Sequence, residues 1–585
     1  MSKRIFLGVF IFLCILMESV SFACTDFQVK AKDGSVIIGR SMEFAMGMDS
    51  EVVVFPKVEK MVSMTSDRTY DILIKGGLVY DGSTAKPVVE DVGVKGDKIV
   101  AVGKDLTGSA KRTINAQGLI VTPGFIDVHN HTDVGILMGL ISSGKFALMT
   151  SGKLDDFSMI TPAWKNNHNY STQGVTTIVT GLCGGGFWDI KQWLGLIDST
   201  KFASNVYHLV PYGMLRYLLF GDNQPTALTA DQLNTLKNMV EKEMKNGALG
   251  VSVGLEYAPD CFTTTDELVE IAKVVNQYGG LYDAHIREQT GTMHQNGLPG
   301  VLNSIKETIE IGKRANIPVH ISHIQLDLPW NNVQAKQMTG LIEQARAEGV
   351  DITADQHPYA AGYAILSYRL PEKFKTGLGV NKKFKNPEGK AQMREAIKKV
   401  FTFLGPEKIS LTSGPEKYRN KTIKEIAEIE GKDPAEVYVD LSCLEPAPFA
   451  LFFEINDQIN REIMPHEYVF TASDGFTVFA PADSPHPRFF GCFPAKIKKY
   501  AVEEKLLGLN DAIRSMTSLP AKKFKIKGRG MIKIGNYADI AVIDLKNLKE
   551  NATYADRGLY SEGVLYLLVN GTLSIDRGKL TGKKR

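Results

Sequence analysis

The sequence predicts an α/β fold, a (β/α)8 TIM-type barrel with a small β domain and an insertion. Strand and helix patterns alternate through the middle of the 585-residue chain, which is typical of a parallel sheet. The alternating region, residues 124–524, is long enough for a complete barrel with an insertion. A doubly wound sheet is the alternative, but the sequence has no Gly-x-Gly-x-x-Gly turn after a first strand to support it.

The N-terminus has the pattern of a secretory signal. Lys3 and Arg4 precede an apolar run, and Ser21-Phe22-Ala23 supplies small residues where a signal peptidase reads. We therefore expect residues 1–23 to be a signal peptide and the mature protein to be secreted or periplasmic. The apolar run is short for a membrane span, and we expect no span elsewhere.

The net charge and the number of cysteines argue against a nucleic-acid-binding protein and against a disulfide-rich protein. The net charge is +3 and basic residues are scattered, so we expect no nucleic-acid partner. Of six cysteines, Cys14 leaves with the signal, and the odd remainder does not make a disulfide framework. At least one thiol should be free or used in chemistry. The expected partner is a small molecule, and the oligomeric state is not predicted.

Both ends of the remaining chain are rich in strands. Short alternating strands separated by Asp-Gly and Gly-Asp turns occupy residues 71–102. A similar pattern returns at 538–543 and 564–571. The sequence therefore predicts a small β-sandwich domain built from residues 65–123 plus 525–585.

The central region gives the clearest helix boundaries. Thr264-x-x-Glu267 is typical of a capping box that opens an amphipathic helix, and Gly279-Gly280 ends it. Further elements are expected as a strand at 281–286, a helix near 301–315, a strand at 317–323, a helix near 333–348 and a strand at 350–355. Residues 360–465 are expected to be an insertion that acts as a lid over the barrel mouth.

Two histidines carry the strongest chemical signal. They lie in Pro123-Gly-Phe-Ile-Asp-Val-His129-Asn-His131, directly after an apolar stretch. Side chains alternate between the faces of a strand, so His129 and His131 are expected to point the same way. Two imidazoles at one strand end can share a metal ion.

Four more candidates follow predicted strands: Cys183, His285, His323 and Asp474. Each alone has an ordinary structural explanation, as a buried thiol, a core histidine or a turn residue. Barrel active sites are built from the carboxyl ends of several strands, so their joint occurrence predicts a metal centre. His320 competes with His323, but it should face the opposite side, and we interpret it as structural.

From about Tyr70 to Gly582 the chain resembles the N-acyl-D-amino-acid deacylase (D-aminoacylase) family of the amidohydrolase superfamily. The motifs that carry the resemblance are His129-Asn-His131, Gly181-Leu-Cys183-Gly, Gly254-Leu-Glu256-Tyr257, His285-Ile-Arg287-Glu288, Ile321-Ser-His323, Ala354-Asp-Gln-His-Pro-Tyr359, Ser473-Asp474-Gly475 and His486-Pro-Arg488. Together they cover most of the chain, and their joint match is highly specific.

The resemblance implies a zinc enzyme. Cys183, His285 and His323 would hold one zinc tightly, and Cys183 stands where related enzymes carry a carboxylated lysine. His129, His131 and Asp474 would form a second, weaker position. Asp474 would take the proton of the attacking water and pass it to the departing amine.

The substrate is expected to be an N-acyl amino acid, which carries a carboxylate. Arg488 matches the family motif and is the first candidate to bind this carboxylate, and a structural arginine that braces a loop is a nearly equal alternative. Tyr359 could donate a hydrogen bond, and Arg287 shares a strand face with His285. The family often has lysine at the position of Gln325 and tyrosine at that of His357, so side-chain preference is not predicted.

Residues 24–61 resemble the start of choloylglycine hydrolase and penicillin V acylase-type Ntn hydrolases. Cys24 would be the nucleophile there and Arg40 an assisting residue. The rest of that fold is missing from the sequence, so we expect residues 24–64 to be a fragment without activity of its own.

The predicted function is zinc-dependent hydrolysis of N-acyl-D-amino acids to a carboxylate and a free D-amino acid. A cyclic amidase of the hydantoinase or dihydroorotase type is the first alternative, and Cys183 in place of lysine argues against it. An Ntn amidase using Cys24 and a non-catalytic barrel are the others.

Overall fold

The computed structural model describes residues 26–30, 36–40, 69–142, 165–376, 379–478 and 485–583. The chain divides into two units, Met1–Arg68 and Thr69–Arg585. In the first unit, strands β1 (Asp26–Lys30) and β2 (Val36–Arg40) pair antiparallel as a two-stranded sheet. The predicted signal peptide and Cys24 lie outside the described residues.

The second unit is built on parallel strands that follow one another in sequence order. One sheet has the order β10-β9-β8 and another the order β11-β12-β13-β14-β15-β21. Their bounds are β8 (Phe125–Asp127), β9 (Val175–Thr180), β10 (Asn205–His208), β11 (Val210–Pro211), β12 (Gly250–Gly254), β13 (Leu281–His285), β14 (Val319–Ile321), β15 (Ile352–Gln356) and β21 (Val469–Thr471). The predicted α/β class is confirmed. The doubly wound alternative is wrong, because neither order reverses direction as that fold requires.

Backbone hydrogen bonds join the two parallel sheets at both of their edges. At the edge between β10 and β11, the amide of Leu209 donates to the carbonyl of Thr180 at 2.9 Å. At the other edge, just beyond β8 and β21, Asn130 forms a parallel bridge with Gly475, and the amide of His131 donates to the carbonyl of Gly475 at 2.7 Å. The carboxyl ends of the first and last parallel strands therefore lie next to each other.

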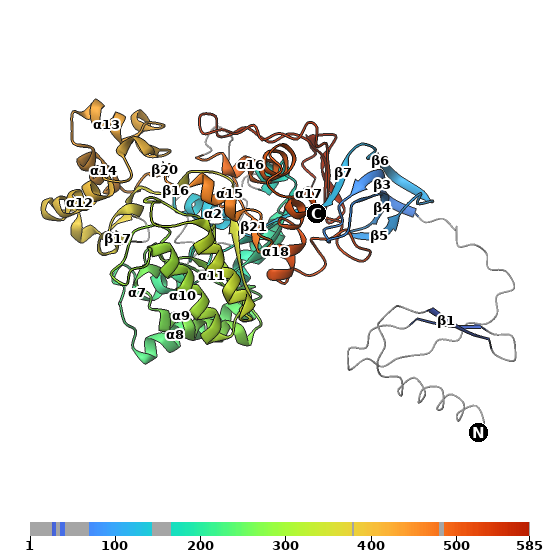
Figure 1. Cartoon of the computed structure of the whole chain (residues 1–585), viewed down its shortest axis with the longest axis horizontal. Coiled ribbons are helices and arrows are strands. Elements are labelled where there is room, and N and C mark those ends of the chain that lie inside the picture. The colour runs from blue at the N-terminus through green and yellow to red at the C-terminus, as the bar shows by residue number, and fades with distance from the viewer. Residues whose placement is uncertain are drawn as a thin grey trace, which may run out of the picture. The chain divides into compact units, whose positions relative to one another are not determined.

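Amphipathic helices alternate with these strands, as the sequence predicts. Helices α8, α9, α10 and α11 lie beside one another in Figure 1. Helix α9 begins after Thr264, whose hydroxyl accepts the amide of Glu267 at 3.2 Å, and Gly279 follows it with φ 67°. The helices are α2 (Thr132–Ser142), α5 (His168–Ser171), α6 (Ile190–Thr200), α7 (Tyr212–Phe220), α8 (Ala230–Lys245), α9 (Thr265–Gln277), α10 (Gly300–Ala315), α11 (Ala335–Ala347), α15 (Asp457–Ile463), α16 (Arg488–Ala495), α17 (Leu509–Arg514) and α18 (Ser518–Lys523), with the short turn η1 (Asp260–Phe262) and the π-helix η8 (Lys496–Glu503). Among the described residues, none of the helices has the length and apolar character needed to cross a membrane.

Strands from both chain ends form one nine-stranded sheet. Its order is β25 (Lys579–Leu580), β24 (Thr572–Asp576), β23 (Val564–Val569), β22 (Ile540–Ile543), β7 (Ile120–Pro123), β3 (Thr69–Val79), β4 (Val88–Lys95) and β5 (Lys98–Gly103), and β6 (Ser109–Asn115) pairs with β3. The antiparallel pair β22–β7 joins the two ends. The strands are hydrogen-bonded in a single sheet instead of the two sheets of the predicted sandwich. Residues from strands on both sides of β7, such as Ile99 of β5 and Leu568 of β23, share one buried core, so the sheet folds around that core.

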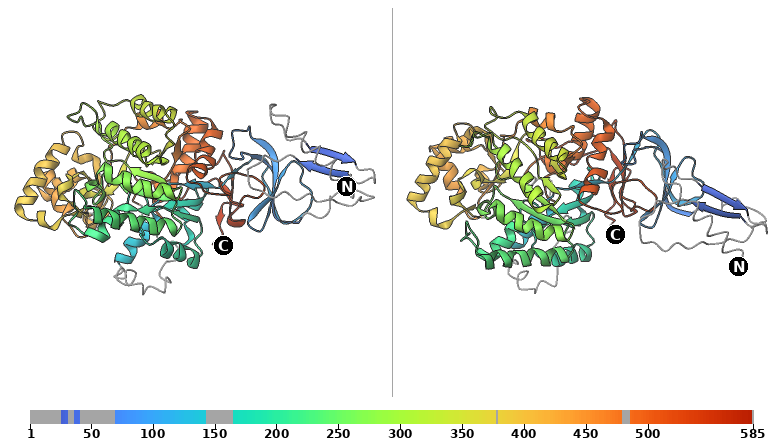
Figure 2. Two further views of the ribbon diagram at one scale, coloured as in Figure 1. Left: turned by 90° about the horizontal axis from the view of Figure 1, so that it is seen from below. Right: turned by 60° about the horizontal axis from the view of Figure 1, so that its bottom comes forward.

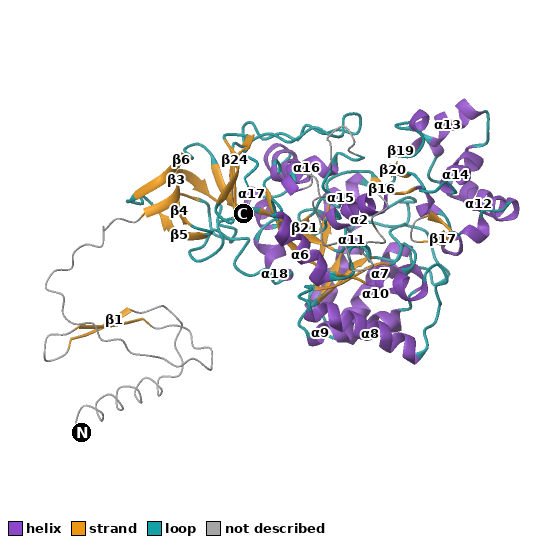
Figure 3. Cartoon of the chain, turned by 180° about the vertical axis from the view of Figure 1, so that it is seen from behind, coloured by secondary structure: helices purple, strands orange, loops and turns teal. Residues whose placement is uncertain are grey.

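The region expected as an insertion has regular structure and a core of its own. It contains the antiparallel sheet β16-β20-β19 and three helices that Figures 2 and 3 show at the end of this unit opposite β3–β6. The elements are β16 (Gly362–Ile365), η2 (Leu366–Arg369), η3 (Glu372–Phe374), β17 (Lys375–Thr376), β18 (Gly379–Val380), η4 (Lys382–Phe384), α12 (Pro387–Val400), η5 (Pro406–Lys408), β19 (Ile409–Leu411), η6 (Glu416–Tyr418), α13 (Ile423–Glu430), α14 (Pro434–Ser442) and β20 (Phe449–Phe452). Tyr257 and Trp330, which lie outside this region, pack against its buried core.

An ion pair ties the nine-stranded sheet to the parallel strands and gives a stability prediction. Arg529 pairs with buried Asp539, which also accepts the side-chain amide of Asn205 at 3.1 Å. Arg529→Met leaves a buried carboxylate without its cation, so we expect the free energy of unfolding to fall by about 3–5 kcal/mol. Denaturant unfolding measures this, with Lys533→Met at an exposed position as control. Equal stability of both variants would contradict the prediction.

Candidate metal centre

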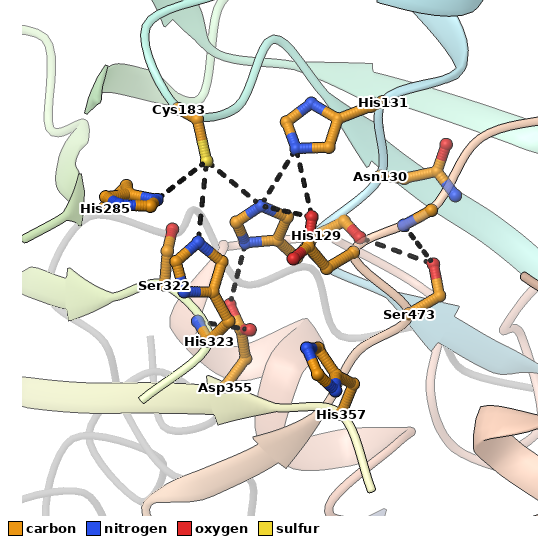
Figure 4. A network of polar contacts seen from close by, with 12 residues as sticks. His129, Asn130, His131, Cys183, His285, Ser322, His323, Asp355, His357 and Ser473 are labelled. Atoms are coloured by element: carbon orange, nitrogen blue, oxygen red, sulfur yellow. Dashed lines mark hydrogen bonds and ion pairs between the residues drawn. The ribbon is translucent and has the colours of Figure 1, made fainter. Parts of the chain in front are cut away.

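The sulfur of Cys183 lies at the centre of a group of imidazoles. Its Sγ is 3.3 Å from His129 Nε2, 3.8 Å from His285 Nδ1 and 3.7 Å from His323 Nε2. Figure 4 shows the three rings converging on the sulfur from different elements. The three residues predicted to hold the tight zinc, Cys183, His285 and His323, bring one ligand atom each within 4.8 Å of the others.

The other predicted set lies directly beside the first. His129 Nε2 is 3.2 Å from His131 Nε2. Asp474 Oδ1 is 3.3 Å from His131 Nε2 and 3.7 Å from His129 Nε2. All six predicted metal residues are therefore in one cluster.

Each of these residues lies at or just beyond the carboxyl end of a parallel strand. His285 ends β13, Cys183 and His323 follow β9 and β14, and Asp474 follows β21. The prediction that His129 lies within a strand is wrong, because β8 already ends at Asp127. The ring nitrogens of His129 and His131 still lie close together, because backbone hydrogen bonds to β9 and to the segment after β21 hold this stretch in place.

The backbone is unusual at three ligand positions. Cys183, His323 and Asp474 have φ values of 51°, 31° and 47°, in the left-handed region that side chains other than glycine rarely occupy. Such conformations cost about 1–3 kcal/mol each and cluster at functional sites. Gly254 allows the close packing there, because a Cβ at that position would lie 2.3 Å from the carbonyl oxygen of Cys183.

Three histidines of the cluster are oriented by hydrogen-bond or ion-pair partners that the sequence did not single out. His285 Nε2 is 3.1 Å from Glu256 Oε2, and His323 Nδ1 is 3.1 Å from Gln289 Oε1. His129 Nδ1 is 3.4 Å from Asp355 Oδ2. Metal-bound histidines commonly present their second nitrogen to such a partner, which fixes the tautomer and the ring orientation. Glu256 and Asp355 both stand in motifs of the family resemblance, and that signal could have found them.

Asp127 and Ser473 join the segments after β8 and β21 that carry His129 and Asp474. The Ser473 amide and hydroxyl donate to the Asp127 carboxylate at 3.0 and 2.5 Å, and the Asn130 side chain donates at 2.9 Å. Burial raises the pKa of Asp127 to about 6, against the effect of these hydrogen bonds. This bracing fixes the spacing between the histidine pair and the aspartate.

The charges of the cluster favour a thiolate. Burial acts to raise the pKa of Cys183, but the charge of His129 and hydrogen bonds from His129, His131 and His285 outweigh it and lower the pKa to about 5. Burial acts to lower the pKa of His285, and the interactions with Cys183 and Glu256 raise it to about 9. Burial acts to raise the pKa of Asp474, but Arg488 and His131 hold it well below its usual value. These donors thus lie close together, with His285 and His323 buried and Cys183 and Asp474 partly exposed.

The three predicted substrate-binding residues have different surroundings. Arg488 lies beside the cluster, with Nη1 3.0 Å from Asp474 Oδ2 and 3.1 Å from His357 Nε2. Arg488 Nε is buried and has no hydrogen-bond partner among the described residues. Arg488 therefore combines contact with the cluster and a donor that the described protein does not use.

Tyr359 and Arg287 are engaged elsewhere. The Tyr359 hydroxyl donates to Glu550 Oε2 at 2.8 Å. Arg287 forms two hydrogen bonds with Glu307, at 2.8 and 3.0 Å, and contacts the carbonyls of Cys261 and Thr263. Both side chains brace the protein in this structure, and their roles in substrate binding stay predictions.

His320 does not take part in the cluster. Its Nδ1 is 2.7 Å from the Thr353 hydroxyl and its Nε2 is 3.0 Å from Asp355 Oδ2. Asp355 also accepts the backbone amide of His323 at 2.8 Å. The structural interpretation of His320 therefore agrees with its contacts to Thr353 and Asp355.

The chain is similar to deacylases over most of its length. No protein-family model matches it. It is 27% identical to the D-aminoacylase of Alcaligenes xylosoxydans xylosoxydans over 547 residues, which covers 89% of this chain and 98% of that enzyme. It is 28% identical to the N-acyl-D-glutamate deacylase of the same organism over 525 residues, covering 86% and 93%. None of these relatives is an Ntn hydrolase, so the resemblance of residues 24–61 gains no support.

Solved structures extend the similarity to the fold. A crystal structure of D-aminoacylase has a TM-score of 0.71 at 26% identity, covering 88% of this chain and 98% of that one. The N-acyl-D-glutamate deacylase of Bordetella bronchiseptica, complexed with zinc and a phosphonate inhibitor, has the same TM-score and coverage at 25% identity. L-hydantoinase from Arthrobacter aurescens, at 15% identity and a TM-score of 0.52, shares the fold alone. The chain is therefore a homologue of the D-aminoacylases and a hydrolase that acts on amide bonds.

Proposed function

We propose that this protein is a zinc-dependent deacylase that hydrolyses N-acyl-D-amino acids to a carboxylate and a free D-amino acid. The observation that carries the proposal is the position of Cys183 Sγ, within 3.3–3.8 Å of three imidazole nitrogens. Relatives that act on N-acyl-D-glutamate and other D-substrates support the configuration of the amino acid.

The donor set fits zinc. Thiolate and imidazole are the ligands that zinc prefers, and three protein ligands leave a fourth position open in catalytic sites. Cys183, His285 and His323 would hold the tight ion, and His129, His131 and Asp474 a weaker second one. The lowered pKa of Cys183, about 5, supplies the deprotonated donor that such a site needs.

The residues around this position can divide the reaction between them. Bound zinc supplies a Lewis acid that polarises the amide carbonyl and lowers the pKa of water. Asp474 Oδ1, which faces His129 and His131, accepts the proton of the attacking water and gives it to the amine nitrogen as the carbon–nitrogen bond breaks. Arg488, beside Asp474, binds the carboxylate of the amino acid through a guanidinium donor that the described protein does not use.

The architecture assigned to this function is one (β/α)8 barrel, residues 124–524. In it, β10 and β11 count as a single interrupted strand, so that the two parallel sheets supply eight strand positions. Residues 360–465 form the lid, residues 65–123 and 525–585 the β domain, and residues 1–23 a signal for export.

The first experiment combines metal analysis with a substrate panel. We expect about one tightly held zinc per chain. We expect hydrolysis of N-acetyl- and N-formyl-D-amino acids and none of their L-enantiomers, with activity lost on chelation and restored by zinc. Amine release and elemental analysis measure these quantities. Hydrolysis that needs no metal and is abolished by Cys24→Ala would overturn the proposal and point to an Ntn amidase.

A second prediction concerns Cys183. Cys183→Ala removes a proposed ligand of the tight zinc, so we expect kcat/KM to fall by more than about 100-fold, since even residues that only support a ligand cost 10- to 100-fold. Zinc content should fall with it. Cys443→Ala, at a half-buried cysteine of the insertion, is the matched control and should keep both. Unchanged zinc content in Cys183→Ala would contradict the assigned ligand set.

The third prediction concerns the proton acceptor. Asp474→Asn keeps the shape of the side chain but removes its basicity, so we expect kcat to fall by about 10²- to 10⁴-fold. The tight zinc should remain, because its three ligands are untouched. Steady-state kinetics and zinc content are measured on the same preparation. Loss of zinc together with activity would show instead that Asp474 is needed to hold the metal.

A further inference from the structure

An arginine of the insertion lies among three carboxylates next to the metal centre, of which Asp327 and Glu454 are buried and Glu256 is 11% exposed. Arg369 ends η2, and its side chain is 7% exposed. Its Nη1 is 3.1 Å from Glu256 Oε1, its Nη2 is 2.8 Å from Asp327 Oδ2, and its Nε is 3.0 Å from Glu454 Oε2. The three acids come from different parts of the chain, after β12, after β14 and after β20. Arg369 is thus the cation that allows these carboxylates to be buried together.

One of these carboxylates connects Arg369 to His285. The two oxygens of Glu256 have separate partners: Oε1 faces Arg369, and Oε2 lies 3.1 Å from His285 Nε2. His285 Nδ1 faces Cys183 Sγ at 3.8 Å. A ring that presents Nδ1 as a metal donor must carry its proton on Nε2, and Glu256 is the acceptor that fixes this tautomer.

The same network reaches the other histidine of the predicted tight site. Gln325 donates to Asp327 Oδ1 at 2.9 Å, and the Asp327 amide donates to the Gln289 carbonyl at 2.9 Å. The Gln289 side chain lies 3.1 Å from His323 Nδ1. Arg369 therefore contacts Glu256, the partner of His285, directly. Through Asp327 it is also linked to Gln289, the partner of His323.

A second contact from the insertion strengthens the link to Glu256. Lys375, in β17, donates to the backbone carbonyl of Glu256 at 3.2 Å. The side chain and the backbone of Glu256 are thus both held by residues of the insertion. Although burial acts to raise its pKa, the hydrogen bond to His285 and the charge of Arg369 lower the pKa of Glu256 to about 2, so it stays an anion.

We propose that Arg369 is a positioning residue that couples the folded insertion to the orientation of His285, acting through Glu256. Without the guanidinium, Glu256, Asp327 and Glu454 would lose the donor that they share, and the Glu256 carboxylate would be free to turn away from His285. His285 would then lose the acceptor that fixes its tautomer. The inference rests on the proposed function only in taking His285 to be a zinc ligand.

The simpler explanation is that Arg369 merely fastens the insertion to the parallel strands. A control of the same kind exists in the same turn: the buried Tyr438 hydroxyl donates to the carbonyl of Leu366, the first residue of η2. Tyr438→Phe loosens this turn but leaves the guanidinium contacts of Arg369 with Glu256, Asp327 and Glu454 in place. A fastening role predicts similar effects of both changes, and a positioning role predicts different ones.

The experiment compares Arg369→Met, Arg369→Lys and Tyr438→Phe with the wild-type protein. Zinc affinity is measured by competition with a chelator, and the visible spectrum of the cobalt(II)-substituted protein reports the ligand geometry. We expect zinc binding about 10- to 100-fold weaker and an altered spectrum in Arg369→Met. Arg369→Lys, which keeps the charge but loses the multiple contacts of the guanidinium, should be intermediate. Tyr438→Phe should match the wild type in both.

The metal-free protein provides a readout that does not depend on zinc. Nitrogen-15 NMR of the histidine rings should show the Nε2 proton of His285 held in a hydrogen bond in the wild type and in Tyr438→Phe, and the loss of this hydrogen bond in Arg369→Met. If Arg369→Met does not fold, the comparison of Arg369→Lys with Tyr438→Phe decides. The proposal would be overturned if zinc affinity and this hydrogen bond follow thermal stability alike in all variants. Absence of zinc binding in the wild type would overturn the proposed function, while the hydrogen-bond comparison would still decide the role of Arg369.

Discussion

The approach of several imidazoles to the sulfur of Cys183 is the constraint on which the arrangement of the parallel strands depends. The groups come from segments far apart in sequence, yet His129 and His323 reach the same sulfur at 3.3 and 3.7 Å. This convergence requires the carboxyl ends of β8, β9, β13 and β14 to lie around one point. It also requires the first and last strands to be joined, which the bridge between Asn130 and Gly475 accomplishes.

Burying this many charges near one another is costly unless every charge has a partner. Ion pairs between residues of the cluster and residues around it offset this cost: His285 with Glu256, His129 with Asp355, and Asp474 with Arg488. Each partner is itself held by a further contact, such as the Arg369 guanidinium on Glu256. Stability and ligand geometry are therefore set by the same contacts, and a change in the outer pairs is expected to alter the inner ones.

The sequence allowed the cluster to be predicted because its members recur at the ends of recognisable strands. Periodicity and capping gave the bounds of α9, α10 and β13 closely, since local side-chain patterns determine them. The same reasoning placed His129 inside a strand, because the side-chain pattern does not show that β8 ends at Asp127. It also missed Arg369 and Glu454, whose significance comes only from the tertiary contacts of a long insertion. The left-handed backbone conformation of Cys183 and Asp474 could not be predicted from the sequence either, because neither residue type requires it.

Asp474 shows how one ion pair can serve two steps of the proposed reaction. Its Oδ2 is held by Arg488 at 3.0 Å, so the other oxygen, Oδ1, is left to face the His129–His131 pair. The guanidinium that would bind the carboxylate of the substrate thus also sets the direction of the proton acceptor. The single contact between Arg488 and Asp474 therefore fixes the distance between the residue that anchors the substrate and the residue that accepts the proton. Only substrates whose amide lies at the matching distance from their carboxylate can be positioned for proton transfer. An α-carboxylate, which is separated from the amide nitrogen by one carbon, places the scissile bond close to this pair, whereas a carboxylate farther along a side chain would place it elsewhere.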